Sequence, residues 1–149
     1  MIRARQRRAT SQLKGYRTGE NDEKRYSEFV YSLKALVIDL NHLANEGWVV
    51  LVEGPRDVKA LTGIGYRGGV VQASTLKRGA RLSLGKVRGI VVLTDLDREG
   101  RRLAGRYARM LVHDGYEVSL DERRRLLAAS GGVFRHVENL SRFSEQLGD

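Results

Sequence analysis

The sequence predicts an α/β fold: a mostly parallel sheet of about four strands, helices on both faces, and an amphipathic helix before the first strand. Two apolar runs, 48–52 and 90–94, have the continuous, β-rich composition of strands that are buried on both faces. Segments with helical periodicity alternate with these runs, which implies βαβ units with right-handed crossovers. A length of 149 residues suits a single core of this kind.

The first half of the chain begins with the amphipathic helix. From Asp22 onward, apolar residues recur at three- and four-residue steps until Gly47 ends the helix as a left-handed cap. Pro55 then stands at a first helical position and predicts a short helix that ends at Gly63. A second strand is expected over residues 70–73. The recurring apolar residues of the first helix are Phe29, Val30, Leu33, Leu36, Val37, Leu40, Leu43 and Ala44.

The second half of the chain holds the third strand and its following helix. A weak helical segment at 79–85 precedes the strand over 90–94. Residues 98–113 then predict a helix with an apolar side and an arginine-rich side, which Gly115 ends. The remaining predicted elements are a fourth strand over 116–120, a short Arg-rich helix over 121–130, a strand or turn over 133–137 and a closing helix from Ser141.

Charge and composition restrict the classes of function. Lys and Arg total 27 against 18 Asp and Glu, so the net charge is +9 and the favoured partner is a polyanion, most often nucleic acid. The absence of cysteine excludes disulfides and thiolate metal sites, and the three histidines, at 42, 113 and 136, lack metal-ligand spacing. A catalytic metal is therefore expected on carboxylates. No apolar run approaches the roughly 20 residues of a membrane span, so we expect a cytoplasmic protein with no membrane partner.

Residues 1–21 are expected to form a basic, flexible arm, and residues 22–149 a single domain that includes the leading helix. The stretch 1–19 carries no acid and hardly any apolar periodicity, so it can contribute little to a core. Two interpretations stay open for the arm: a solubilising tail, or a segment that orders on a nucleic-acid backbone. The arm arginines proposed for nucleic-acid contact are Arg3, Arg5, Arg7 and Arg8.

Acidic residues follow two of the predicted strands. Glu53 ends the first strand, and Asp95 and Asp97 end the third. Because the carboxyl ends of parallel strands meet at one edge of a sheet, these carboxylates should lie close together and repel one another unless a cation neutralises them. Mg²⁺ is the expected ion, with Mn²⁺ as an alternative, and Glu99 could join through water or a second ion. The competing interpretation is that one Asp caps the following helix and Glu53 has no function.

The segments VVLVEG and IVVLTDLDREG, with Asp57 four residues after the Glu, resemble the Toprim domain. Topoisomerases, bacterial-type primases, some nucleases and the maturase of bacterial 5S ribosomal RNA share this domain, in which one strand ends in Glu and a later one in Asp-x-Asp. The resemblance covers about residues 48–120 and implies a Rossmann-like sheet. The long leading helix and small size look most like the stand-alone archaeal Toprim proteins.

The resemblance also implies roles for individual residues. Glu53 matches the general acid/base of nucleotidyl transfer, Asp95 and Asp97 match the Mg²⁺ ligands, and Glu99 matches a third acid found in topoisomerases. Gly54 would allow close backbone approach to the site, although a plain turn is an equal explanation. Asp57 matches a frequent family acid, or it caps the helix or pairs with a basic neighbour.

Arginines on the helix 98–113 begin immediately beyond the acidic residues. Such a stripe could hold phosphates near a metal, and Arg123, Arg124 and Arg125 could extend it; the alternative is an ordinary solvated helix face. Aromatic residues make up only 7% of the chain, so backbone contact should dominate, which favours structured RNA over DNA. The arginines proposed for the stripe are Arg98, Arg101, Arg102, Arg106 and Arg109.

These features predict a Mg²⁺-dependent protein that hydrolyses phosphodiesters in structured RNA, such as a ribosomal RNA precursor. Strand passage and primer synthesis are not expected, because the family's topoisomerases need a nucleophilic tyrosine on separate gate domains and its primases a zinc-binding region. One alternative is a non-catalytic module that binds Mg²⁺ and nucleic acid on a ribosomal particle or in a processing complex. Another is an accessory subunit whose partner completes a topoisomerase or primase.

Overall fold

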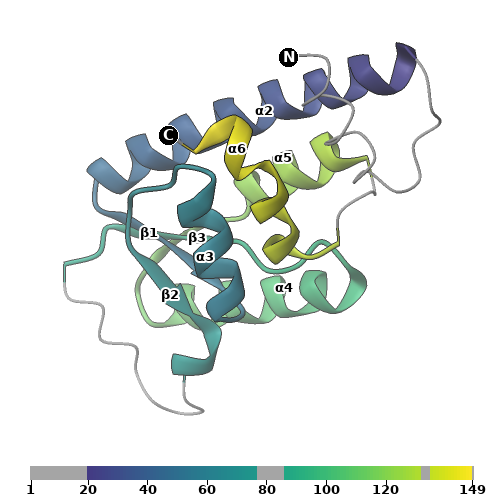
Figure 1. The fold of residues 1–149 in the computed structure, drawn as a ribbon. Coiled ribbons are helices and arrows are strands. Elements are labelled where there is room, and N and C mark those ends of the chain that lie inside the picture. Colours follow the sequence, from purple (N-terminus) through teal and green to yellow (C-terminus); the bar gives the residue numbers. More distant parts are fainter. Residues whose placement is uncertain (1–19, 77–85, 132–134, 149) are drawn as a thin grey trace.

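The strands of the computed structural model form one parallel sheet in the order β2-β1-β3-β4 (Figure 1). The structure describes residues 20–76, 86–131 and 135–148. β1 and β3 are the central strands, and their register runs from Trp48 opposite Gly89 to Leu51 opposite Val92. The residues that follow these two strands therefore emerge at the same edge of the sheet. The strands are β1 Trp48–Val52, β2 Val70–Gln72, β3 Gly89–Val92 and β4 Glu117–Ser119.

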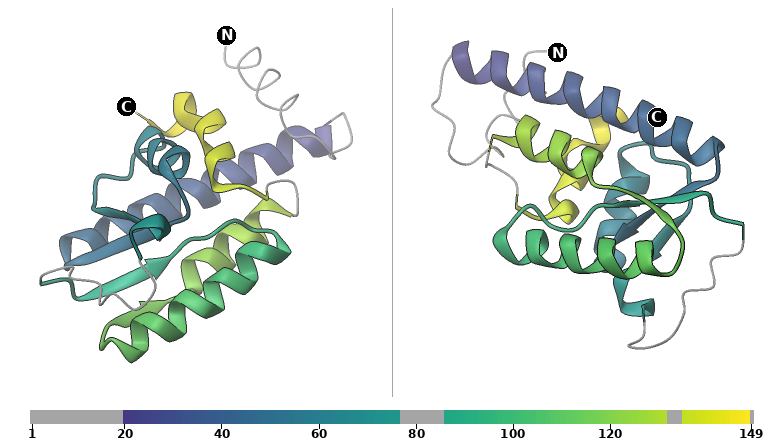
Figure 2. Two further views of the ribbon diagram at one scale, coloured as in Figure 1. Left: turned by 90° about the horizontal axis from the view of Figure 1, so that it is seen from below. Right: turned by 180° about the vertical axis from the view of Figure 1, so that it is seen from behind.

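Helices cover both faces of the sheet. α3 (Pro55–Gly63) connects β1 to β2, and α4 (Arg98–His113) connects β3 to β4. These two connections run in opposite directions along the sheet, so right-handed crossovers place α3 and α4 on opposite faces. α2 (Glu20–Asn45) and α5 (Asp121–Ser130) share the face of α3, with α4 on the other side of the sheet (Figures 1 and 2).

The central strands supply side chains to both layers of the core. In β1, Val50 and Val52 pack with the α2, α3 and α5 layer, whereas Leu51 between them packs with the α4 layer. In β3, Val91 belongs to the first layer and Ile90 to the second. This alternation is the two-residue period of a strand, and it leaves neither face of the central strands to water, as the continuous apolar runs predicted.

The leading helix α2 packs along the molecule through one apolar stripe. Phe29 and Tyr26 of this helix meet the ring of Phe143 near the C-terminus, with centroids 5.0 Å and 5.9 Å apart. Gly47 has φ 96°, the left-handed conformation expected at the end of the helix. The buried residues of the stripe are Tyr26, Phe29, Leu33, Leu36, Val37 and Leu40.

The C-terminal segment consists of a 3₁₀ helix, η2 (Val137–Phe143), and one α-helical turn, α6 (Ser144–Leu147). η2 packs against α3 and buries Val137, Leu140 and Phe143 in the first core layer. The prediction of a closing helix from Ser141 was wrong in its start, because residues 141–143 still belong to η2. Of the strand or turn predicted over 133–137, residues 133 and 134 lie outside the described residues, and Val137 begins the 3₁₀ helix.

The predicted fold class is confirmed, with small corrections at the strand ends. Ala73, predicted as strand, begins the 3₁₀ turn η1 (Ala73–Thr75), and β3 ends at Val92, although the N–H of Leu93 still bonds to Leu51 O at 2.8 Å. The basic stretch 1–19 and the weak helix predicted at 79–85 lie outside the described residues. Among the helices that the structure describes, none is long and apolar enough to cross a membrane.

Candidate functional site

Glu53 lies at the carboxyl end of β1 and contacts the loop after β3. Its Oε2 accepts a hydrogen bond from the backbone N–H of Asp95 at 2.7 Å. Burial raises the pKa of the Glu53 carboxyl above its ordinary value, and the negative charges of Asp95 and Asp57 raise it further, while the hydrogen bond from the Asp95 backbone opposes the shift. Glu53 is therefore a carboxyl group that holds its proton more tightly than an exposed glutamate.

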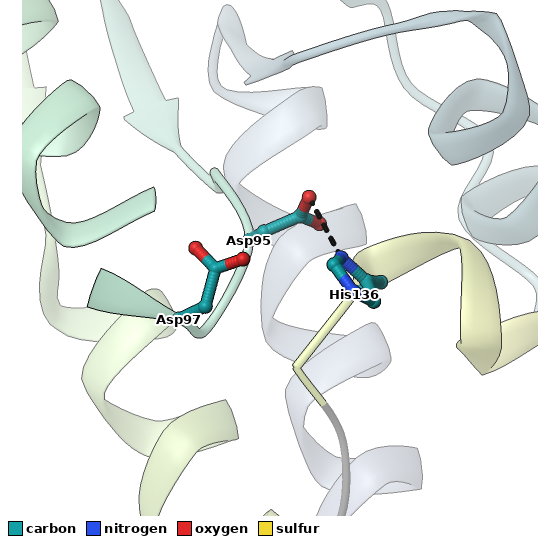
Figure 3. Close-up of side chains that lie close together, drawn as sticks. All are labelled: Asp95, Asp97 and His136. Atoms are coloured by element: carbon teal, nitrogen blue, oxygen red, sulfur yellow. Dashed lines mark hydrogen bonds and ion pairs between the residues drawn. The ribbon is translucent and has the colours of Figure 1, made fainter. Parts of the chain in front are cut away.

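Asp95 has three contacts with groups from other elements of the chain, of which Figure 3 shows the one with His136. Its Oδ1 accepts the backbone N–H of Val137 at 2.8 Å, and its Oδ2 lies 3.2 Å from Nδ1 of His136. The guanidinium of Arg123 donates to its backbone oxygen at 2.6 Å. The position of Asp95 thus depends on α5 and on the segment before η2 as well as on β3.

Asp97 begins α4 as its N-cap residue. Its Oδ1 accepts the N–H of Gly100 at 2.6 Å, and the buried hydroxyl of Thr94 donates to Gly100 O, also at 2.6 Å. A Cβ atom at Gly100 would overlap the backbone carbonyl of Asp95, so only glycine lets the loop and the helix approach this closely. The capping role that we weighed as an alternative for this residue is present, and it uses one of the two carboxylate oxygens.

The side chains of Asp95, Asp97 and His136 form one group of metal-binding type, which Figure 3 shows. One ligand atom from each residue lies within 4.8 Å of the other two. The donor set fits a divalent cation, because Oδ2 of Asp97 accepts no hydrogen bond from the described residues and two neighbouring carboxylates favour a positive charge between them. Glu53 approaches this group through its bond to the Asp95 backbone.

Asp57 and Gly54 lie beside Glu53 at the start of α3. The buried Asp57 carboxylate accepts the N–H of Gly54 at 3.1 Å, and burial raises the pKa of Asp57. This is the capping arrangement that the sequence analysis offered beside the family role. Gly54 is extended, with φ −152°, and a Cβ atom there would meet nothing within 4 Å, so no group of the described chain demands glycine at this position.

Glu99 is placed apart from the acidic group. It forms an exposed ion pair with Arg102, in which Arg102 Nε donates to Glu99 Oε2 at 3.0 Å, and this bond lowers the pKa of Glu99. In this conformation the Glu99 carboxylate is turned to its own helix face rather than to Asp95 and Asp97.

The predicted stripe on α4 is exposed, whereas Arg123 is not. Only 7% of Arg123 is accessible, its Nε has no hydrogen-bond partner, and burial lowers its pKa while Asp97, Glu53 and Asp95 oppose that shift. Its neighbours Arg124 and Arg125 pair with Asp121 and Asp39, so the triple Arg is no single solvated face. The stripe arginines, all exposed, are Arg98, Arg101, Arg102, Arg106 and Arg109. The arm arginines Arg3, Arg5, Arg7 and Arg8 lie outside the described residues.

Sequence reasoning missed His136 and the burial of Arg123. His136 stands 41 residues after Asp95, in a different element, and nothing in ligand spacing connects them. Asp95 raises the pKa of His136, chiefly through the contact between their side chains. A signal for the burial of Arg123 was present in the sequence, because Arg123 stands three residues before Leu126 and seven before Ser130, on the buried face of α5.

Comparison with known proteins decides the family. The Toprim domain family matches residues 48–125, from the start of β1 to the middle of α5. The chain belongs to the Toprim family. Toprim domains typically bind Mg²⁺, and the Asp95, Asp97 and His136 group is where this one could hold a metal.

Relatives of this Toprim protein occur in archaea. A UPF0292 protein of Pyrococcus abyssi is 33% identical over 92 residues, which is 61% of this chain and 70% of the relative. A UPF0292 protein of Archaeoglobus fulgidus is 28% identical over 109 residues, covering 73% of this chain and 86% of the relative. Among solved structures, a protein of Aquifex aeolicus has 29% identity and a TM-score of 0.59, covering 71% of this chain and 95% of that one. The expected likeness to archaeal Toprim proteins is confirmed.

Proposed function

We propose that this Toprim protein is a Mg²⁺-dependent phosphodiesterase that cleaves structured RNA, such as a ribosomal RNA precursor. The observation that carries the proposal is that Glu53, a carboxyl group whose pKa is raised, accepts a hydrogen bond from the backbone of Asp95, a member of the group of metal-binding type. Glu99 would join only through water or a second ion, since it is paired with Arg102.

Glu53 has the properties of a general acid/base. Its Oε2 is fixed by the Asp95 N–H, and the side chain of Asp95 interacts with the same carboxyl group. A carboxyl group held in this way beside the metal-binding group could take a proton from an attacking water or hydroxyl. The raised pKa of Glu53 moves it toward the operating pH, as proton transfer in both directions requires. A bound divalent ion would supply polarisation of the phosphodiester at Asp95 and Asp97.

The arginines of α4 are proposed to hold the RNA backbone. They begin one residue after Asp97 and are exposed along a helix of 16 residues, so phosphates on either side of a scissile bond could follow them. Aromatic residues are few, and contact with phosphates and with overall shape suits structured RNA better than base reading does. Processing of ribosomal RNA is proposed from the family resemblance to the 5S maturase.

A second candidate is a non-catalytic module that binds Mg²⁺ and RNA, for instance on a ribosomal particle or in a processing complex. One observation bears on it: Oδ1 of Asp95 and Oδ1 of Asp97 each accept a backbone N–H, so each carboxylate has one oxygen fewer to offer a metal ion. In this case the same arginines would bind phosphate and Glu53 would not be needed for affinity.

The test is incubation with structured RNA, single-stranded DNA and plasmid DNA, each with Mg²⁺, with Mn²⁺ and with chelator. We expect discrete metal-dependent RNA products that disappear in Glu53→Gln and Asp97→Asn. Glu117→Gln is the matched control, because it makes the same charge change at an exposed residue at the amino end of β4. RNA binding without products in any condition would refute the nuclease and support the module; products that survive in Glu53→Gln would refute the assigned acid/base.

A further inference from the structure

The group at the end of β3 contains a nitrogen donor that is not part of the matched Toprim segment. The family match ends at residue 125, and His136 comes from the segment before η2. The His136 side chain is 50% exposed and that of Asp95 20% exposed, so an ion arriving from solvent can reach both. Three ligand atoms within 4.8 Å of one another therefore come from two carboxylates and one imidazole.

The chemistry of this donor set differs from that of an all-carboxylate site. Mg²⁺ prefers oxygen ligands and keeps several of its waters, so an imidazole adds little to its binding. Imidazole nitrogen suits Zn²⁺, Cu²⁺, Fe²⁺ and Ni²⁺, and the affinity of a mixed nitrogen and oxygen site rises from Mn²⁺ to Cu²⁺ along the first transition row. Replacing one water by His136 should thus strengthen the binding of such an ion much more than that of Mg²⁺.

The geometry fits shared coordination. Two ligands, each about 2.1 Å from one ion, lie roughly 3.0 Å apart when their bonds make a right angle. The separation of Asp95 Oδ2 and His136 Nδ1 is 3.2 Å, close to that value, so an ion could replace the hydrogen bond that the two side chains now share. The N–H of Val137, the next residue, holds the other oxygen of Asp95 at 2.8 Å and so fixes the carboxylate relative to the ring.

We propose that His136 is the third protein ligand of the metal site, with Asp95 and Asp97, and that the site binds a divalent first-row transition-metal ion more tightly than Mg²⁺. This inference rests on the metal site of the proposed function. It does not depend on RNA cleavage.

The test uses the full chain with Mn²⁺ as the probe. Solution electron paramagnetic resonance of free Mn²⁺ gives the affinity, competition gives that of Mg²⁺, and pulsed measurements detect ¹⁴N coupling from a coordinated imidazole. We expect ¹⁴N coupling in the wild type that is lost in His136→Gln, with Mn²⁺ affinity falling about 10-fold or more and Mg²⁺ affinity changing about 2-fold or less. His42→Gln, an exposed histidine on α2, is the control and should keep both signals.

The outcomes separate this inference from the proposed function. Bound Mn²⁺ without ¹⁴N coupling, or equal weakening of both ions in His136→Gln, would overturn the inference and leave a carboxylate site in place. Failure to bind either ion would remove the metal site itself. Nitrogen coupling in a protein that cleaves no RNA would support the inference and refute the nuclease. Circular dichroism of His136→Gln in chelator checks that the fold is intact.

Discussion

Replacing Gly100 by Ala tests how tightly the acidic loop is clamped to α4. The added Cβ would lie 2.5 Å from the carbonyl carbon of Asp95 and overlap its oxygen, so backbone must move. Overpacking of this kind costs about 1–3 kcal/mol. The movement also strains the Asp97 cap and the Thr94 hydroxyl bond, each worth about 1 kcal/mol. The better helix propensity of alanine offsets about 1 kcal/mol, so the net predicted loss is about 2–4 kcal/mol.

Gly105→Ala is the matched control on the same helix. Its Cβ would meet only the flexible end of Arg109, at 3.4 Å, and alanine is the better helix former by about 1 kcal/mol. Thermal unfolding followed by circular dichroism in chelator should therefore show Gly100→Ala melting about 10 °C below the wild type and Gly105→Ala slightly above it. A Gly100→Ala melting temperature equal to or above that of the wild type would refute the close packing of Gly100 against the Asp95 carbonyl.

Three further predictions concern separate parts of the molecule. Burial raises the pKa of Tyr66 to about 12, so the folded state keeps a proton that the unfolded state loses near pH 10, and stability falls as pH rises between these values. Tyr66→Phe should be about 1 kcal/mol less stable in urea at pH 7, having lost the bond to Gly69 O, and the deficit should shrink above pH 10; a constant deficit would contradict the assignment. Arg106→Gln should lower the salt slope of RNA binding by about one unit, with Arg124→Gln, already paired on α5, as the control; equal slopes would remove α4 from the interface. Arg123→Met should cost about 3 kcal/mol in urea unfolding, because the part-buried carbonyl of Asp95 loses its donor and the nearby carboxylates lose a cation. A loss below about 0.5 kcal/mol, typical of a surface residue, would contradict the burial of Arg123.

The central sheet could be predicted because its signal is local. A continuous apolar run has few alternatives to a buried strand, and both β1 and β3 lie where such runs occur. The residue at which a strand ends depends on its neighbouring strands, which the sequence of that strand does not specify. β4 is only three residues long, and this limits how far β3 can be paired on that side. The C-terminal 3₁₀ helix did leave a trace, since Val137, Leu140 and Phe143 recur at three-residue steps, the period of that helix.

The carboxylates of the site could be predicted for a topological reason. Parallel neighbours in register bring their carboxyl ends together, so residues directly after β1 and β3 had to meet. No such rule places His136 or Arg123. His136 reaches Asp95 because η2 packs on α3, and Arg123 reaches it because α5 packs beside β3. Both placements follow from the tertiary packing of helices, and the sequences of these helices contain no motif that points to the site.

The C-terminal segment, residues 135–147, contacts both the hydrophobic core and the acidic loop after β3. Its buried side chains, Val137 among them, fill the layer between α2 and α3, while its backbone reaches the loop after β3. Arg135 O accepts the N–H of Leu96 at 2.6 Å, and the N–H of Val137 donates to the Asp95 carboxylate. The residues directly before and after His136 therefore both bond to the acidic loop. A change in the packing of η2 would therefore move the ligand atoms directly. In this chain Asp95 and Asp97 follow one Toprim strand, and a segment beyond the matched residues fixes Asp95 and carries the imidazole of His136.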